Sequence, residues 1–150
     1  MKTLTVSNGD IQLNSGKLQF STGQQKLIED LQRWLEEPLG TGYTTPGFGS
    51  LLHSYIGKNQ SSVSASSIDN EILRVLQLYQ GQQVISLKNA QNAAMLANWN
   101  KSEIIQSIIS VKSALQGTSI VANVQLTTLD NSTISLNLSV DNNGVTVQNG

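Results

Sequence analysis

Cysteine is absent from the 150 residues, and histidine occurs once, at His53. The lack of cysteine excludes disulfides, thiolate metal ligands and cysteine nucleophiles, and a single histidine excludes sites built from several imidazoles. Charged residues make up 13%, about half the usual share, and the net charge is −1. Without a basic excess, nucleic acid is not an expected partner. A nearly neutral surface favours association between protein chains.

Aromatic residues make up 5% of the chain, which argues against a stacking platform for single strands. No apolar run approaches the roughly 18 residues of a membrane span. The opening "MKTLTVSNGD" lacks the apolar run of a signal peptide. No internal repeat is evident, so we expect a single domain over residues 1–150.

The first half of the chain predicts a β-hairpin followed by a helix. Residues 3–20 alternate between apolar and polar, with turn sequences at Asn8-Gly9 and at 14–16, which predicts two or three short strands. Residues 23–37 have helical spacing, with Ser21 or Thr22 as the cap and Pro38 as the stop. The apolar positions of this helix are Leu27, Ile28, Leu31, Trp34 and Leu35.

A glycine-rich loop over 39–57, containing a short helical turn, leads to a polar linker over 58–67. Ser66 or Ser67 is then the expected cap of one long helix that ends near Trp99, with Gly81 as its weak point. Around residues 82–87 the pattern fits a strand as well as a helix.

The last third predicts an antiparallel meander after a turn and a short helical start over 100–110. Ile109, Val111 and Ser113 would share one face of the first strand, and a last short strand would lie near 145–148. The other two strands would bury one face each, with Ala122, Val124, Leu126, Ile134, Leu136, Leu138 and Val140. The fold class is therefore α+β, with an N-terminal β-hairpin, two main helices and a C-terminal antiparallel β-meander packed against the helices.

This predicted sheet carries little charge. From Ile104 to Gly150 the charged residues are Lys112, Asp130 and Asp141. Sheet edges are usually guarded by lysine, proline or bulges. Two explanations stay open: neighbouring elements of the chain cover both edges, or one edge is left for a strand from a partner.

The glycine-rich loop does not match a phosphate-binding motif. Gly42 and Gly47 have P-loop spacing, but Phe48 stands where the lysine is required, and Thr45 breaks the dinucleotide pattern. The loop is better explained as a packed connector whose backbone needs glycine.

No catalytic constellation is visible. His53 could act as a base for Ser50 or Ser54, but a surface or packed histidine is the simpler explanation. Glu36 and Glu37 are adjacent on a helix end, unlike the facing carboxyl groups of a glycosidase. We therefore expect no catalytic residues, no metal, no cofactor and no enzymatic activity.

The order of several segments resembles the baseplate wedge proteins of contractile phage tails, also called sheath initiators or lysozyme-like baseplate proteins. The segments are "GDIQL…GKLQFSTGQQKLIEDLQRWL", "GTGYTTPGFGSLLHSYIG", "EILRVLQLYQGQQ", "NKSEIIQSI" and "VANVQLTTLDNSTISLNLSV". Residues 46–51 resemble the family's Pro-x-aromatic-Gly-x-x-Leu signature. The Glu-Pro-Arg motif that many members carry after the second helix is missing, so the wedge contacts made through that motif are not expected here.

The resemblance implies a structural virion protein of the tail baseplate, assembled in the host cytoplasm, in a phage or a phage-derived contractile injection system. Its implied partners are the tail sheath subunit, baseplate wedge proteins, and tail tube or hub proteins, with about six copies around the tail axis. The first sheath ring would dock by strand exchange, and neither nucleic acid nor a membrane is expected. The predicted contact residues are Pro46, Phe48, Gly49, Ser135, Asn137, Val145 and Val147.

Two other functions stay open. Some members of the family carry a lysozyme annotation, so the main alternative is a lysozyme-type cell-wall hydrolase of the tail. A free-standing adhesin is a weaker option.

Overall fold

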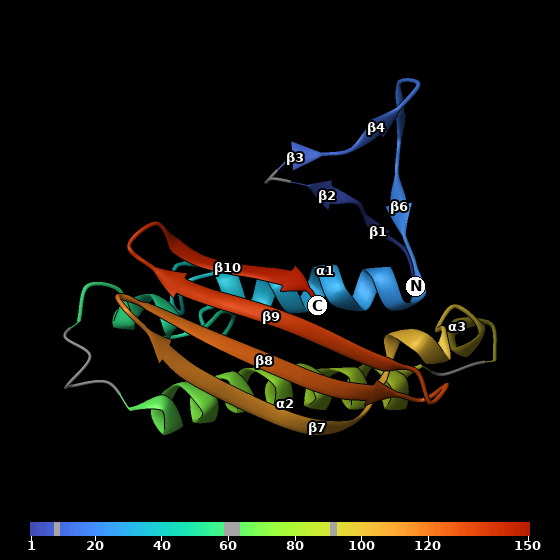
Figure 1. Cartoon of the computed structure of the whole chain (residues 1–150). Helices are drawn as coiled ribbons and strands as arrows, with labels where there is room; N and C mark the ends of the chain where they lie inside the picture. The colour runs from blue at the N-terminus through green and yellow to red at the C-terminus, as the bar shows by residue number, and fades with distance from the viewer. Residues whose placement is uncertain (8–9, 59–63, 91–92) are drawn as a thin grey trace.

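The computed structural model describes residues 1–7, 10–58, 64–90 and 93–150 (Figure 1). Two helices, α1 (Gly23–Glu36) and α2 (Ala65–Asn89), pack against one face of a four-stranded antiparallel sheet. The sheet contains β7 (Ile105–Gln116), β8 (Ser119–Thr128), β9 (Thr133–Asp141) and β10 (Gly144–Asn149), in the order β10-β9-β8-β7. The predicted α+β class is confirmed.

The core lies between this sheet and the two helices. Alternate residues of β8 and β9 face inward because successive side chains of a strand point to opposite faces. Val124, Leu126 and Leu136 are fully buried, as are Leu27 and Leu31 of α1. The alternation predicted for these two strands and the apolar stripe predicted for α1 are therefore confirmed.

The first strand of the sheet differs from the prediction. After a single turn of 3-10 helix, η3 (Lys101–Glu103), β7 starts at Ile105, where a helical start was expected. Its pairing with β8 shifts register between Ile105 and Ser107 and again between Ile108 and Ser110. These bulges place Ile108 against the core and leave Ile109 53% exposed. The prediction that Ile109 shares one face of the strand with Val111 and Ser113 is therefore wrong.

The second helix also differs at both ends. Its cap is Ser64, not Ser66 or Ser67, because the Ser64 hydroxyl accepts the Ser67 N–H at 3.2 Å. The helix runs without a break through Gly81 and ends at Asn89, and a separate helix, α3 (Ala93–Ala97), follows. The prediction of a single helix that ends near Trp99 is therefore wrong. Residues 82–87, whose pattern fitted a strand as well as a helix, are helical. Of the predicted linker 58–67, residues 59–63 lie outside the described part.

The segment between the helices contains a short 3-10 helix, η1 (Leu52–Tyr55). This confirms the helical turn predicted inside the glycine-rich loop. Thr22 is the N-cap residue of α1, and the helix ends just before Pro38, as predicted.

Residues 3–7 and 10–21 form a triangular unit that stands away from the body of the molecule (Figure 1). It consists of three two-stranded antiparallel ladders, β1 with β6, β2 with β3, and β4 with β5. Ser15 (φ 51°) and Gly16 (φ 75°) form the tight turn between β4 and β5. The hairpin predicted at 14–16 is confirmed, and Asn8-Gly9 lies outside the described residues. The strands are β1 (Thr3–Leu4), β2 (Val6–Ser7), β3 (Asp10–Ile11), β4 (Leu13–Asn14), β5 (Lys17–Leu18) and β6 (Phe20–Ser21).

A closed ring of backbone hydrogen bonds joins the three ladders at the centre. The N–H of Thr5 donates to Gln19 O (2.9 Å), that of Gln12 to Thr5 O (2.9 Å), and that of Gln19 to Gln12 O (3.1 Å). These residues are seven apart, and the sequence repeats with the same period: "TLTVSNG", "DIQLNSG", "KLQFSTG". The expectation of no internal repeat was therefore wrong. We call residues 3–21 the triangular plate.

Candidate functional site

The two edges of the sheet differ in how their backbone is covered. On β10, the outward N–H of Val147 donates to Glu36 Oε1 at 2.8 Å, and Gln32 Nε2 donates to Val147 O at 2.9 Å. Gln32 and Glu36 are four residues apart and therefore lie on one face of α1. This pair, which we call the α1 clamp, bonds Val147 as a neighbouring strand would. At Val147 the β10 edge is thus covered by the chain itself.

Glu36 also lies at the centre of a small polar group. Burial raises the pKa of its carboxyl, while the Val147 N–H and nearby His53 oppose that shift. His53 Nε2 donates to the backbone oxygen of Glu36 at 2.6 Å. The single histidine therefore ties η1 to the C-terminal end of α1.

The opposite edge, β7, is covered only at its start. Gln80 Nε2 donates to the backbone oxygens of Ile105 and Gln106, both at 3.2 Å. Beyond the second bulge, residues 110–116 receive no hydrogen bond on their outer side from the described part of the chain. Lys112 is the only charge in this strand. We call residues 110–116 the open β7 edge, because no hydrogen bond from the described residues covers its outer backbone as the clamp covers Val147. The Ser113 side chain does contact α2, since its hydroxyl donates to Ala65 O at 2.8 Å.

The predicted contact residues in the sheet lie elsewhere. Ser135 and Asn137 sit on β9, whose backbone is paired on both sides. Their side chains accept hydrogen bonds from Asn123 Nδ2, at 3.2 and 2.8 Å. They belong to the exposed face, not to an edge. Val145 and Val147 are 7% and 4% exposed, so their side chains belong to the core.

The glycine-rich loop packs tightly where it passes α1. Gly49 has φ 105°, and a Cβ there would lie 2.6 Å from Glu37 O. The N–H of Ser50 donates to Glu37 O (2.8 Å), and that of Leu39 donates to Ser50 O (2.9 Å). These contacts support a packed connector, with Gly49 buried inside it.

Ser50 and His53 do not form the catalytic pair that their spacing allowed. The Ser50 hydroxyl donates to Leu35 O at 2.6 Å, and His53 bonds Glu36 O. Both side chains satisfy carbonyl groups at the end of α1, which have no partner inside the helix.

Two other loop residues reach the surface. Phe48 packs edge-on against Trp34, with ring centroids 4.7 Å apart, and Pro46 is exposed. Between this loop and α2 lies a hollow of about 590 Å³, lined in part by Pro46, Phe48, Leu78 and Gln82. Pro46 and Phe48 are therefore accessible to a partner.

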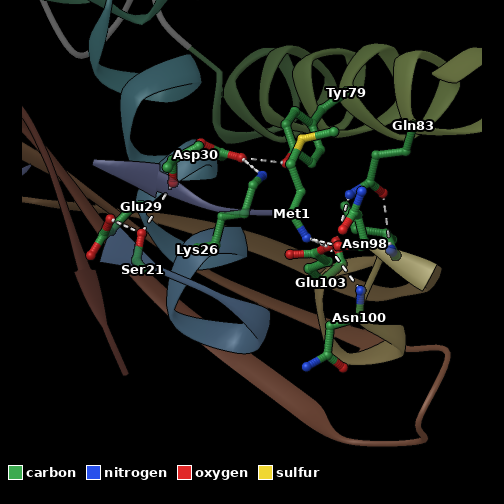
Figure 2. A network of polar contacts seen from close by, with 12 residues as sticks. Met1, Ser21, Lys26, Glu29, Asp30, Tyr79, Gln83, Asn98, Asn100 and Glu103 are labelled. Atoms are coloured by element: carbon green, nitrogen blue, oxygen red, sulfur yellow. Dashed lines mark hydrogen bonds and ion pairs between the residues drawn. The ribbon is translucent and has the colours of Figure 1, made fainter. Parts of the chain in front are cut away.

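A buried polar network joins α1, α2 and the start of β7 (Figure 2). Ser21 Oγ donates to Glu29 Oε2 at 2.7 Å, and Tyr79 OH donates to Asp30 Oδ2 at 2.9 Å. Lys26, itself buried, forms an ion pair with Asp30. Burial, together with the charge of Asp30, raises the pKa of the Tyr79 hydroxyl. Sequence analysis missed this network, since nothing in the spacing separates Glu29 or Lys26 from surface residues.

Glu103 is the most deeply buried carboxylate of the network. Its side chain is 0% exposed, and Oε1 accepts the Asn100 N–H at 2.9 Å and lies 2.7 Å from the Met1 amino group. Gln83 links α2 to the same turn, because Nε2 donates to Glu103 O at 2.6 Å and Oε1 accepts the Ile105 N–H at 3.0 Å. The capping box at Asn100 and Glu103 fixes where β7 begins.

The carboxylates of this network hold elements together and do not face one another across a cavity. Among four well-formed cavities of about 330 to 1110 Å³ in the described residues, Asp141 is the single carboxylate in any lining. Within the same residues, no cluster of three side chains has the makings of a metal site. None of the described helices is long and apolar enough to cross a bilayer.

Comparison with models of protein families, with curated proteins and with solved structures finds no match to this chain. The resemblance to contractile-tail baseplate proteins therefore remains a prediction, and the function rests on the surfaces described above.

Proposed function

We infer that this chain is a structural component of a contractile-tail baseplate, and that its open β7 edge takes a strand from the first ring of sheath subunits. The observation that carries this inference is the contrast between a clamped β10 and an uncovered β7. Strand addition uses main-chain hydrogen bonds for affinity, and residues 110–116 supply such groups over the length of an ordinary strand.

The α1 clamp gives the assembly a direction. Because Gln32 and Glu36 already bond both polar groups of Val147, an incoming strand would have to displace them to join β10. Addition at β7 requires no such displacement. Each copy would then accept a strand on one side only, as a protein that starts a sheath must.

The remaining surfaces fit an assembly role. The net charge of −1 leaves little electrostatic repulsion between copies or partners. Pro46 and Phe48, beside the hollow of about 590 Å³, offer a contact for a wedge neighbour. The bonded carboxylates are in keeping with a protein that is not an enzyme.

The experiment compares lysine substitutions at the edge with a matched substitution on the exposed face. Ala114→Lys and Gln116→Lys place charge on exposed residues of the open edge, where lysine opposes strand pairing. Asn137→Lys is the control, because this exposed residue lies on a strand paired on both sides. Each variant is first shown to melt cooperatively like the unaltered chain.

The readout is capture of the sheath subunit encoded in the same genome, together with electron microscopy of the tails produced. We expect the edge variants to lower capture at least tenfold and to give tubes without sheath, while Asn137→Lys behaves normally. If Asn137→Lys alone blocks sheath attachment, docking uses the exposed face and the edge mechanism is wrong. Normal sheathed tails from all three variants would refute the proposed function.

A further inference from the structure

The triangular plate has one apolar face. Residues opposite each other in a ladder point to the same side, and Leu4 is opposite Phe20, as Leu13 is opposite Leu18. Thr5, Gln12 and Gln19 are seven residues apart, and each donates its N–H to the carbonyl oxygen of another of the three, so the three positions of the ring are equivalent. A rotation about its centre therefore carries each ladder onto the next without exchanging the two faces of the plate.

This apolar face has no cover within the described chain. Ile11, Leu13, Leu18 and Phe20 are 52%, 62%, 51% and 55% exposed. A two-stranded ladder is marginal in water without something to pack on, yet the plate stands clear of the helices and the sheet (Figure 1). Exposed apolar patches of this kind mark interaction sites.

A second uncovered apolar surface lies on α2. Leu78, Val84 and Ile85 are 43%, 43% and 59% exposed, and no charged residue occurs between Arg74 and Lys88. Leu78 and Ile85 are seven residues apart and share a helix face, with Gly81 between them. We call Leu78, Gly81, Val84 and Ile85 the outer α2 stripe.

No contact among the described residues explains the glycine at position 81. A Cβ at this position would meet nothing within 4 Å, and the backbone does not need a positive φ. Glycine in a helix interior costs about 1 kcal/mol relative to alanine. A glycine at such a place allows another backbone to approach closely.

We propose that the apolar face of the triangular plate of one copy packs on the outer α2 stripe of a neighbouring copy. The plate cannot reach its own stripe, since it rises beyond α1 and β10 while α2 lies on the far side of the body (Figure 1). One contact thus covers both uncovered apolar surfaces, and Gly81 lets the plate of the neighbouring copy approach α2 closely.

The contact joins two different faces, so it repeats head to tail and closes into a ring when the rotation allows. Four plate side chains, each about half exposed, offer on the order of 400 Å² at about 200 Å² per large side chain. Twice that area is below the roughly 1,200 Å² of stable interfaces. Pairs of free chains therefore associate weakly, and a covalent trap is the suitable assay.

The absence of cysteine makes the trap clean. Full-length Leu13→Cys and Ile85→Cys are mixed under mild oxidation, and disulfide-linked dimers are measured on non-reducing gels. Asn14→Cys mixed with Ile85→Cys is the matched control, because Asn14 is exposed and points to the other face of the plate. We expect at least tenfold more linked dimer from Leu13→Cys with Ile85→Cys than from the control.

Two outcomes overturn the proposal. If Leu13→Cys links to itself as fast as to Ile85→Cys, the plates pack on each other. If the yield equals that of the control, the plate takes another partner or none. Neither outcome bears on sheath capture, which is measured separately.

Gly81→Ala in the Ile85→Cys chain provides an independent test. This change should raise the melting temperature of the chain by a few degrees, because alanine favours the helix. The same change should lower the yield of linked dimer severalfold, since the added methyl group separates the two chains. A stabilised chain with unchanged yield would contradict close approach at Gly81.

Discussion

The α1 clamp makes a measurable prediction about the β10 edge. Glu36→Ala removes the oxygen that accepts the Val147 N–H at 2.8 Å. Hydrogen bonds to charged groups contribute roughly 1.5–3 kcal/mol, and the lower figure suits a half-buried carboxylate. We therefore expect a loss of about 1.5 kcal/mol in the free energy of unfolding, or about 3–6 °C in melting temperature for a chain of this size.

Glu36→Gln separates the hydrogen bond from the charge. Glutamine keeps an oxygen acceptor for Val147, so this variant should lose less stability than Glu36→Ala. Because burial raises the pKa of Glu36 above its ordinary value of 4.5, the folded state favours the protonated form. Its contribution is fully present below pH 4.5 and declines as pH rises through the folded pKa. The stability of Glu36→Gln relative to the unaltered chain should thus increase between pH 4 and pH 7.

Amide hydrogen exchange at Val147 is the direct assay. In the unaltered chain this amide should be protected, although it points away from β9. Exchange should accelerate in Glu36→Ala and change less in Glu36→Gln, while Thr146 and Leu138, whose amides face neighbouring strands, exchange as before as internal references. Unchanged exchange at Val147 in Glu36→Ala would show that the clamp does not close this edge.

Two further predictions concern the glycine-rich loop and catalysis. Gly49→Ala should destabilise the chain by about 1–3 kcal/mol, because the residue has φ 105° and the new methyl group meets Glu37 O; Gly47→Ala, where a Cβ meets nothing within 4 Å, is the control in thermal melts. The purified chain should give no clearing in a peptidoglycan zymogram, since no two carboxylates share any of the four cavities found among the described residues; clearing that disappears in Glu71→Gln or Glu29→Gln would establish the hydrolase alternative.

The elements with one clear period could be predicted from the sequence. On β8 and β9 every second residue is apolar, so Val124 and Leu136 fall in the core as expected. The stripe of α1 behaves in the same way. Side-chain periodicity determines which face is buried, and these segments contain no interruption that shifts it.

Errors arose where a second interaction overrode the local pattern. Two bulges in β7 shift the phase, so Ile109 is exposed although its spacing from Val111 fits one face. Ser64 caps α2 ahead of the serines at 66 and 67 because its hydroxyl reaches the Ser67 N–H. The sequence could not show which sheet edge is open and which is closed either. The α1 clamp joins Glu36 and Gln32 to Val147, which lies 111 and 115 positions further along the chain.

The seven-residue repeat was missed because its units are short and mostly small and polar. Alternation within each unit suggests an ordinary hairpin, and the decisive evidence is the ring that joins Thr5, Gln12 and Gln19. Nothing in a single unit indicates that three of them close on one another.

The closed ring of hydrogen bonds limits which insertions and deletions the triangular plate can accept during evolution. A single inserted or deleted residue between Thr5 and Gln19 would put the three amide groups out of phase and open the ring. A fourth unit would find no place in a threefold arrangement, and two units could not complete it. We expect evolutionary variants of this chain to differ here by substitution, with the distance from the first unit to α1 held constant.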